Sequence, residues 1–158
     1  KQFANYWIHN GLIKINGQKM SKSLNNSIFL SDLLNNYNAE VIRFGLLGNK
    51  YNSDINVVDG LFESAENKLY EIYKTFAQLD TVSNGLVSDK SSDEYSSIKS
   101  EFIETMNNDF NTAVAIANVY NHISTIKKLI QQKELTKNGR NSVVYIAFAT
   151  LLGYIVAI

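Results

Sequence analysis

Apolar side chains between residues 57 and 82 recur at a helical period, and this spacing constrains the fold more than any other feature. The steps along the chain are four, four, three, four and three residues, through Leu61, Ala65, Leu69, Ile72, Phe76 and Leu79. A long helix with one apolar face must bury that face against other elements. The sequence therefore predicts a mainly α fold in which this helix is part of an antiparallel bundle.

Further helices are indicated on both sides of this one. Ser31 is a candidate N-cap of a short helix, and Asn38 is a candidate N-cap of a helix that runs to about Leu47. A helix over about residues 98–106 is then interrupted by residues 107–111, four of which are polar.

The last third of the chain predicts two more helices. Asn111 or Thr112 caps the first, whose apolar stripe is Ala113, Ile116, Tyr120, Ile123, Lys127 and Ile130. The apolar run 143–158 predicts the second. This run has 16 residues, and a bilayer span needs about 20. We therefore expect a bundle helix here, with no membrane partner.

The first part of the chain lacks the helical pattern of apolar residues. Residues 6–18 favour extended structure, and Asn16-Gly17 is a strong signal for a short hairpin. Residues 18–27 have no apolar period and predict a polar loop. The expected architecture is thus a short β/loop segment followed by the helical bundle.

The formal net charge of zero conceals a strong asymmetry along the chain. Residues 1–50 carry six basic and two acidic side chains, residues 51–110 carry four and twelve, and residues 111–158 carry five and one. The late basic cluster is usually a solvated face, and a contact with an RNA backbone is the alternative. Its candidate RNA-binding residues are Lys127, Lys128 and Arg140.

The segment Lys19-Met20-Ser21-Lys22-Ser23 is the strongest chemical signal in the sequence. Two ammonium groups three residues apart in a polar loop can converge on one anionic group, and lysine suits phosphate as a compact charge with rotatable donors. The two serine hydroxyls add further donors. We expect a loop that closes over a polyphosphate and stabilises charge on a leaving group.

These five residues match the KMSKS motif of class I aminoacyl-tRNA synthetases, and the flanking residues narrow the match. The chain resembles cysteinyl-tRNA synthetases in the segments 5–11, 23–26, 41–44, 51–53 and 108–113. The resemblance implies that residues 1–30 end a Rossmann-type catalytic domain. Residues 31–158 would form a helical bundle of the DALR type that contacts tRNA. The family usually has glycine at the position of Asn25.

The resemblance also implies an activity. Such an enzyme activates cysteine with ATP and Mg²⁺ to cysteinyl-adenylate and pyrophosphate, and then transfers the cysteinyl group to tRNA(Cys). Lys22 would stabilise the α-phosphoryl transition state and Lys19 would act on the pyrophosphate side. ATP would be bound by Lys19, Met20, Ser21, Lys22, Ser23 and His9.

The chain looks like an internal piece of a longer protein, because it begins with Lys1 and ends within an apolar run. Its partner would be the preceding catalytic domain, with the HIGH-type ATP motif and the zinc ligands upstream and no metal site here. We expect the piece alone to be inactive. The absence of cysteine fits a reducing compartment such as the cytoplasm.

Alternative interpretations remain open at this point. A paralogue that joins cysteine to an amino-sugar would use the same adenylate chemistry without tRNA. A non-catalytic helical module that binds tRNA is the third possibility. His9 is more typical of a turn or packing residue than of a catalytic base, and Trp7 fits either a core aromatic or a nucleotide stacker.

Overall fold

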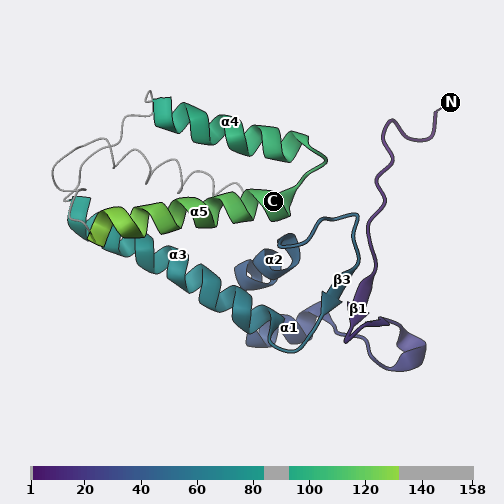
Figure 1. Cartoon of the computed structure of the whole chain (residues 1–158). Coiled ribbons are helices and arrows are strands. Elements are labelled where there is room, and N and C mark those ends of the chain that lie inside the picture. The colour runs from purple at the N-terminus through teal and green to yellow at the C-terminus, as the bar shows by residue number, and fades with distance from the viewer. Residues whose placement is uncertain (1, 84–92, 132–158) are drawn as a thin grey trace.

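The computed structural model describes residues 2–83 and 93–131, and it is mainly helical as predicted (Figure 1). The elements lie in the order β1 (Ile13–Ile15), β2 (Gln18–Lys19), a 3₁₀ turn η1 (Lys22–Leu24), α1 (Leu30–Asn36), α2 (Ala39–Leu47), β3 (Ile55–Val57), α3 (Leu61–Ser83), α4 (Asp93–Asn107) and α5 (Thr112–Gln131). The helix predicted over residues 143–158 lies outside the described residues.

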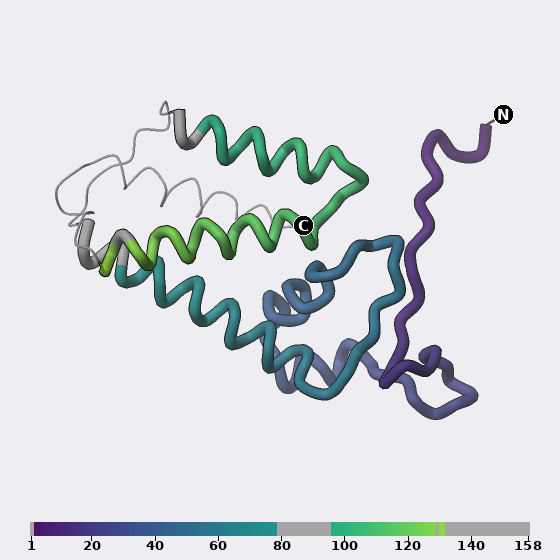
Figure 2. Tube along the Cα trace, in the orientation of Figure 1, coloured from purple at the N-terminus to yellow at the C-terminus, as the bar shows by residue number. Residues whose placement is uncertain are grey.

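The predicted hairpin is present as the antiparallel pair β1 and β2. It turns through Asn16 and Gly17, whose φ angles are 48° and 83°, the left-handed values that a tight two-residue turn requires. The residues predicted to form only a polar loop also contain β2 and the turn η1. Residues 2–12 form no strand and run from β1 alongside the segment that precedes β3 (Figure 2).

The third strand, β3, was not predicted. It pairs in parallel with β1, with Ile13 opposite Ile55 and Ile15 opposite Val57, so the sheet order is β2-β1-β3. The prediction that the long helix begins near residue 57 was therefore wrong, because the backbone there completes the sheet. Helix α3 begins four residues later, at Leu61.

The helix caps were predicted with mixed success. The Asn38 side chain caps α2 by accepting a hydrogen bond from the Glu40 backbone N–H at 3.1 Å, as expected. Ser31 does not cap α1. This helix begins at Leu30, and its N-cap residue is Phe29, whose side chain makes no capping hydrogen bond. The Asn111 side chain accepts from the Val114 backbone N–H at 3.3 Å, which confirms its predicted place before α5.

The core lies where α3 packs between α2 and α5. Ile72 of the predicted stripe has no exposed surface. Thr75, one turn further along α3, is also buried, and its hydroxyl donates a hydrogen bond to the Glu71 carbonyl at 2.7 Å. The buried apolar residues are Val41, Ile42, Phe44, Phe62, Ala65, Leu69, Ile72, Ile98, Ala115, Ile116, Val119, Ile123 and Ile126.

The apolar surface of α5 is wider than the single stripe predicted for it, because α5 packs against both α3 and α4. Ile116 and Ile123 are buried as predicted, and Ala115, Val119 and Ile126 are buried as well. Helix α4 begins at Asp93, earlier than predicted, and runs opposite to α5 (Figure 1). This antiparallel pair confirms the predicted bundle.

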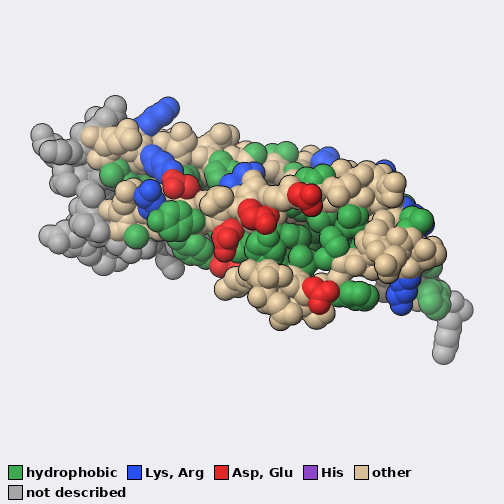
Figure 3. Space-filling view, turned by 90° about the horizontal axis from the view of Figure 1, so that it is seen from below, with side chains coloured by type: hydrophobic (Ala, Val, Ile, Leu, Met, Phe, Trp, Pro, Cys, Tyr) green, Lys and Arg blue, Asp and Glu red, His purple; other side chains and the backbone are tan. Residues whose placement is uncertain are grey.

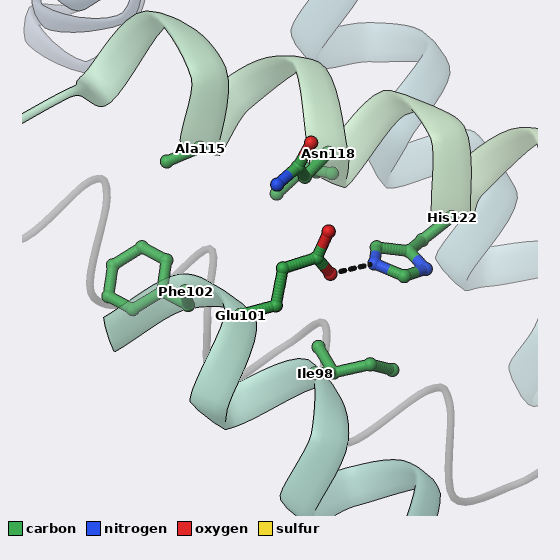
Figure 4. A pocket seen from close by; sticks show the side chains of 7 residues that line it. Ile98, Glu101, Phe102, Ala115, Asn118 and His122 are labelled. Carbon is green, nitrogen blue, oxygen red and sulfur yellow. Dashed lines mark hydrogen bonds and ion pairs between the residues drawn. The ribbon is translucent and has the colours of Figure 1, made fainter. Parts of the chain in front are cut away.

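Polar side chains join the helices at their edges. Glu101 of α4 and His122 of α5 face each other across a small pocket, with the His122 Nε2 atom 3.0 Å from the carboxylate (Figure 4). A view of the molecule from below shows carboxylates spread among hydrophobic side chains (Figure 3). In residues 2–83 and 93–131, no helix has the length and apolarity that a bilayer crossing requires.

Candidate functional site

The hairpin and η1 present both lysines of the pentad to solvent. Lys19 ends β2 and Lys22 begins η1, and both side chains are exposed. Within the described part of the chain, neither ammonium has an ion-pair partner. The two charges are therefore available to an external anion.

Hydrogen bonds within the pentad fold its second half into a compact turn. The Ser21 hydroxyl accepts from the Ser23 backbone N–H at 3.2 Å and lies 2.7 Å from the Ser23 hydroxyl. The turn closes at Asn25, where φ is 50° and the backbone N–H donates to the Lys22 carbonyl at 3.1 Å. Asparagine tolerates this left-handed conformation better than other residues with a side chain, so it can stand where glycine is usual.

The Asn26 side chain fixes the pentad from behind, which sequence reasoning did not predict. Its amide oxygen accepts from the Ser21 backbone N–H at 2.8 Å, and its amide nitrogen donates to the Lys19 carbonyl at 3.2 Å. One side chain thus bridges two backbone positions of the loop and sets the path between the two lysines.

Met20 anchors the loop to the core. Its backbone N–H donates to the Ile13 carbonyl at 3.0 Å, and its side chain lines an apolar hollow of about 200 Å³ with residues from the sheet, α1, α2 and α3. Within the pentad, the Met20 thioether thus faces the core, and the ammonium groups of Lys19 and Lys22 face solvent. The expected contact of Met20 with ATP stays a prediction.

An ion pair on β1 offsets the positive charge of a lysine beside the pentad. Lys14 is directly opposite Lys19 in the hairpin, and like charges in that position repel. The Lys14 ammonium lies 2.8 Å from the Asp54 carboxylate, which also accepts from the Leu12 backbone N–H at 2.9 Å. The hydrogen bond from Lys14 holds the pKa of Asp54 below its usual value.

The segment 51–57, which we call the strap, connects the hairpin to the helical bundle. On the hairpin side, the Gly11 N–H donates to the Tyr51 carbonyl at 2.8 Å, and the Gly17 N–H donates to the Asn56 side chain at 2.8 Å. On the bundle side, the Tyr51 hydroxyl and the Asn52 amide donate to the two carboxylate oxygens of Asp109 at 2.6 and 3.1 Å. The hydrogen bond to Asp109 raises the pKa of Tyr51.

The close approach of Gly11 to the strap leads to a prediction. A Cβ atom at this position would lie 2.0 Å from the Ser53 carbonyl oxygen, so the backbone of β1 or the strap must move. We expect Gly11→Ala to lower the free energy of unfolding by about 1–3 kcal/mol, the usual cost of overpacking. Urea denaturation would measure it.

Gly48→Ala is the matched control for this substitution. The nearest atom to a Cβ there lies 3.6 Å away, which is ordinary contact, and the φ angle of −64° suits any residue. We expect a change within about 0.5 kcal/mol. Equal losses in the two variants would contradict the close packing of Gly11 against the strap.

Two family models match different parts of this chain. Residues 1–67 match the family model of the class I (C) tRNA synthetase catalytic domain, and residues 101–158 match the DALR domain. The cysteine–tRNA ligase of Thermodesulfovibrio yellowstonii is 37% identical over 140 residues, and that of Campylobacter concisus is 35% identical over 158 residues. This chain is therefore similar to part of the cysteine–tRNA ligases.

The alignments differ in how much of each protein they cover. They include 84% and 100% of this chain, but only 29% and 32% of the two ligases. A solved structure with the same fold is the agnB2 LeuRS of Agrobacterium radiobacter K84 in a complex named LeuRS-tRNA-LeuAMS. Its TM-score is 0.71 at 19% identity, over 94% of this chain and 21% of the LeuRS.

Two further candidate residues, His9 and Trp7, lie in the segment before β1. His9 is exposed, and within the described residues no hydrogen bond or ion pair joins it to the hairpin lysines. Trp7 is 69% exposed and stacks on Phe3 at a centroid distance of 6.0 Å. Trp7 is therefore not a core aromatic in this structure.

The three candidate RNA-binding residues are not equivalent in the structure. The Lys127 ammonium lies 2.8 Å from Glu71 of α3, and this hydrogen bond lowers the pKa of that carboxyl. Lys128 is exposed on α5, and Arg140 lies outside the described residues. Lys127 therefore holds α5 against α3, as well as being a candidate for RNA contact.

Metal ligands were expected upstream of this chain. In residues 2–83 and 93–131, no group of three or more histidine, cysteine or acidic side chains could hold a metal ion. The pentad offers two ammonium groups, which repel a divalent cation, beside two serine hydroxyls. The exposed ammonium groups are of the kind that bind phosphate.

Proposed function

We propose that this chain works in a cysteine–tRNA ligase as the part that carries the KMSKS loop and the tRNA-facing helices. The observation that carries the proposal is the pair of exposed ammonium groups, Lys19 and Lys22, on a loop whose backbone is fixed by Asn26 and Met20. Preorganised cations of this kind stabilise charge where it develops in a transition state.

The reaction begins with ATP and cysteine. The cysteine carboxylate attacks the α-phosphorus, a bond forms between carboxylate oxygen and phosphorus, and the bond to the leaving oxygen breaks. Pyrophosphate leaves with the electron pair, so negative charge grows on the leaving side. Lys22 would stabilise the α-phosphoryl group in this transition state, and Lys19 would neutralise the pyrophosphate.

The serine hydroxyls of the pentad are further candidate phosphate contacts, and transfer to tRNA is the second step of the proposed reaction. Ser21 and Ser23 would donate hydrogen bonds to phosphate oxygens, with His9 as a further candidate contact. The cysteinyl group then passes from the adenylate to the 3′ end of tRNA(Cys), which releases AMP. Mg²⁺ would be bound by the ATP phosphates and by residues other than the pentad.

The proposed division of labour has two parts, whose bounds differ from the matches to the two family models over residues 1–67 and 101–158. Residues 1–30 would end the catalytic domain, and residues 31–158 would form the bundle that contacts tRNA, with Lys127, Lys128 and Arg140 as candidate contacts. Zinc would be held by residues outside the described part of this chain. Because ribosomes consume charged tRNA, the proposal places the enzyme in the cytoplasm.

Isotope exchange between pyrophosphate and ATP tests this function. We expect the complete ligase to incorporate labelled pyrophosphate into ATP only when cysteine is present, because adenylate formation is reversible. Serine, which has a hydroxyl in place of the thiol, is the matched control and should support far less exchange. Exchange that does not depend on the amino acid would refute the proposal.

A further inference from the structure

We propose that Asp109, in the turn between α4 and α5, is a positioning residue for the KMSKS hairpin. Its carboxylate fixes the strap, and the strap fixes the hairpin that carries Lys19 and Lys22. This inference rests on the proposed function, because it concerns how the same loop is held for reaction. Nothing in the pentad itself indicates it, since Asp109 lies far along the chain in the helical bundle.

The turn that carries Asp109 has an unusual backbone. Asp109 and Phe110 have φ angles of 56° and 50°, and consecutive left-handed residues with side chains are costly. The turn is held by a hydrogen bond from the Phe110 N–H to the Met106 carbonyl at 2.9 Å, and Thr112 N–H donates to the Phe110 carbonyl at 2.7 Å. This geometry directs the Asp109 carboxylate at the strap.

Both oxygens of the Asp109 carboxylate accept a hydrogen bond from the strap. One oxygen accepts from the Tyr51 hydroxyl and the other from the Asn52 amide. The Tyr51 ring also packs edge-on against Phe110, with a centroid distance of 6.3 Å. Two hydrogen bonds and one ring contact therefore fix the first two residues of the strap to the turn.

The rest of the strap holds the hairpin at both ends. The Tyr51 carbonyl accepts from Gly11 just before β1, and Asp54 accepts from Leu12 and pairs with Lys14. At the tip of the hairpin, the Gly17 N–H donates to Asn56. Each of these contacts is a directional bond to a residue of the hairpin or next to it.

The other attachment of the hairpin is apolar. Ile13, Ile15 and Met20 line the hollow shared with α1, α2 and α3, and apolar contact is non-directional. It holds the hairpin against the core but does not fix its angle. The directional contacts through the strap therefore set where the two ammonium groups lie. A shift of about 1 Å at such a site can lower a rate by two orders of magnitude.

The test uses Tyr51→Phe and Asp109→Asn in the complete ligase. The first removes only the hydroxyl that donates to Asp109, and the second replaces the charged acceptor by an amide of the same shape. Tyr73→Phe is the matched control, because its hydroxyl donates to Glu40 in the contact of α3 with α2, away from the strap. The hydrogen-exchange rates of the Gly17 and Met20 backbone amides report how firmly the hairpin is held, because both amides donate hydrogen bonds there.

We expect both test variants to exchange the Gly17 and Met20 amides faster, by about 3- to 10-fold, which is the usual effect of one net hydrogen bond. The kcat of pyrophosphate exchange should fall by a similar factor while the KM for cysteine stays unchanged. Tyr73→Phe should leave the hairpin amides and the kcat unchanged. An additional Asp109→Glu variant should recover part of the loss, because a carboxylate is restored.

Faster exchange confined to residues 49–52 and 106–112, with unchanged hairpin amides and kcat, would overturn the inference and leave Asp109 a local structural residue. An equal effect of Tyr73→Phe would overturn it as well. Failure of the proposed function has a different signature. In that case the unmodified enzyme shows no cysteine-dependent exchange of pyrophosphate, whatever the hairpin amides do.

Discussion

Replacing Lys22 by alanine in the complete ligase is expected to lower the rate of cysteinyl-adenylate formation by about 10²- to 10³-fold, the usual effect of removing one preorganised electrostatic group. Lys22 is exposed at the start of η1, and its backbone is fixed by the turn that closes at Asn25. The substitution removes the charge without disturbing the core. Pyrophosphate exchange at saturating cysteine measures the rate.

The same measurement separates a transition-state role from a binding role. The KM for cysteine should change little, because Lys22 is placed to contact phosphate and not the amino acid. Lys68→Ala is the control, since Lys68 is an exposed lysine of α3 outside the hairpin. An unchanged exchange rate in Lys22→Ala, or an equal loss in Lys68→Ala, would contradict the proposed role.

The largest expected effect on stability belongs to Ile72. This side chain has no exposed surface and lies in the middle of α3, where α3 packs between α2 and α5. Ile72→Ala should lower the free energy of unfolding by about 2–5 kcal/mol, because it removes buried methyl groups and leaves a cavity. Urea denaturation followed by circular dichroism measures the loss.

Ile103→Ala is the matched control for the core substitution. Ile103 is also helical but is 45% exposed on α4, so its truncation should cost less than about 1 kcal/mol. Similar losses in the two variants would show that α3 does not form the centre of the core.

Local signals in the sequence predicted much of the fold. The Asn16-Gly17 turn, the Asn38 cap and the apolar stripe of α3 each depend on neighbouring residues and were confirmed. Strand β3 was missed because three residues are too few to show alternation. Its pairing with β1 connects residues about forty positions apart, as in Ile13 and Ile55.

The candidate site divides in the same way. The ammonium groups of the pentad could be predicted because residue type alone specifies their chemistry. The roles of Asn26 and Asp54 could not, because each depends on which backbone group folds next to it. The motifs around Tyr51 and Asp109 were both noted in the sequence, but only the fold shows that they bind each other.

The same limit applies to Lys127. Its place on the apolar stripe of α5 was visible in the sequence, and so was its positive charge. Its partner Glu71 lies 56 residues away on α3, and no local pattern connects the two. An exposed basic cluster and a helix-to-helix ion pair therefore look alike until the helices are placed.

The most direct test of the account is the transfer of labelled cysteine to an acceptor by the complete ligase in the presence of ATP. The account predicts that the label becomes attached to the 3′ end of tRNA(Cys), and that Lys22→Ala slows this charging. Label found on an amino-sugar with none on tRNA, or charging that Lys22→Ala leaves unchanged, would contradict it.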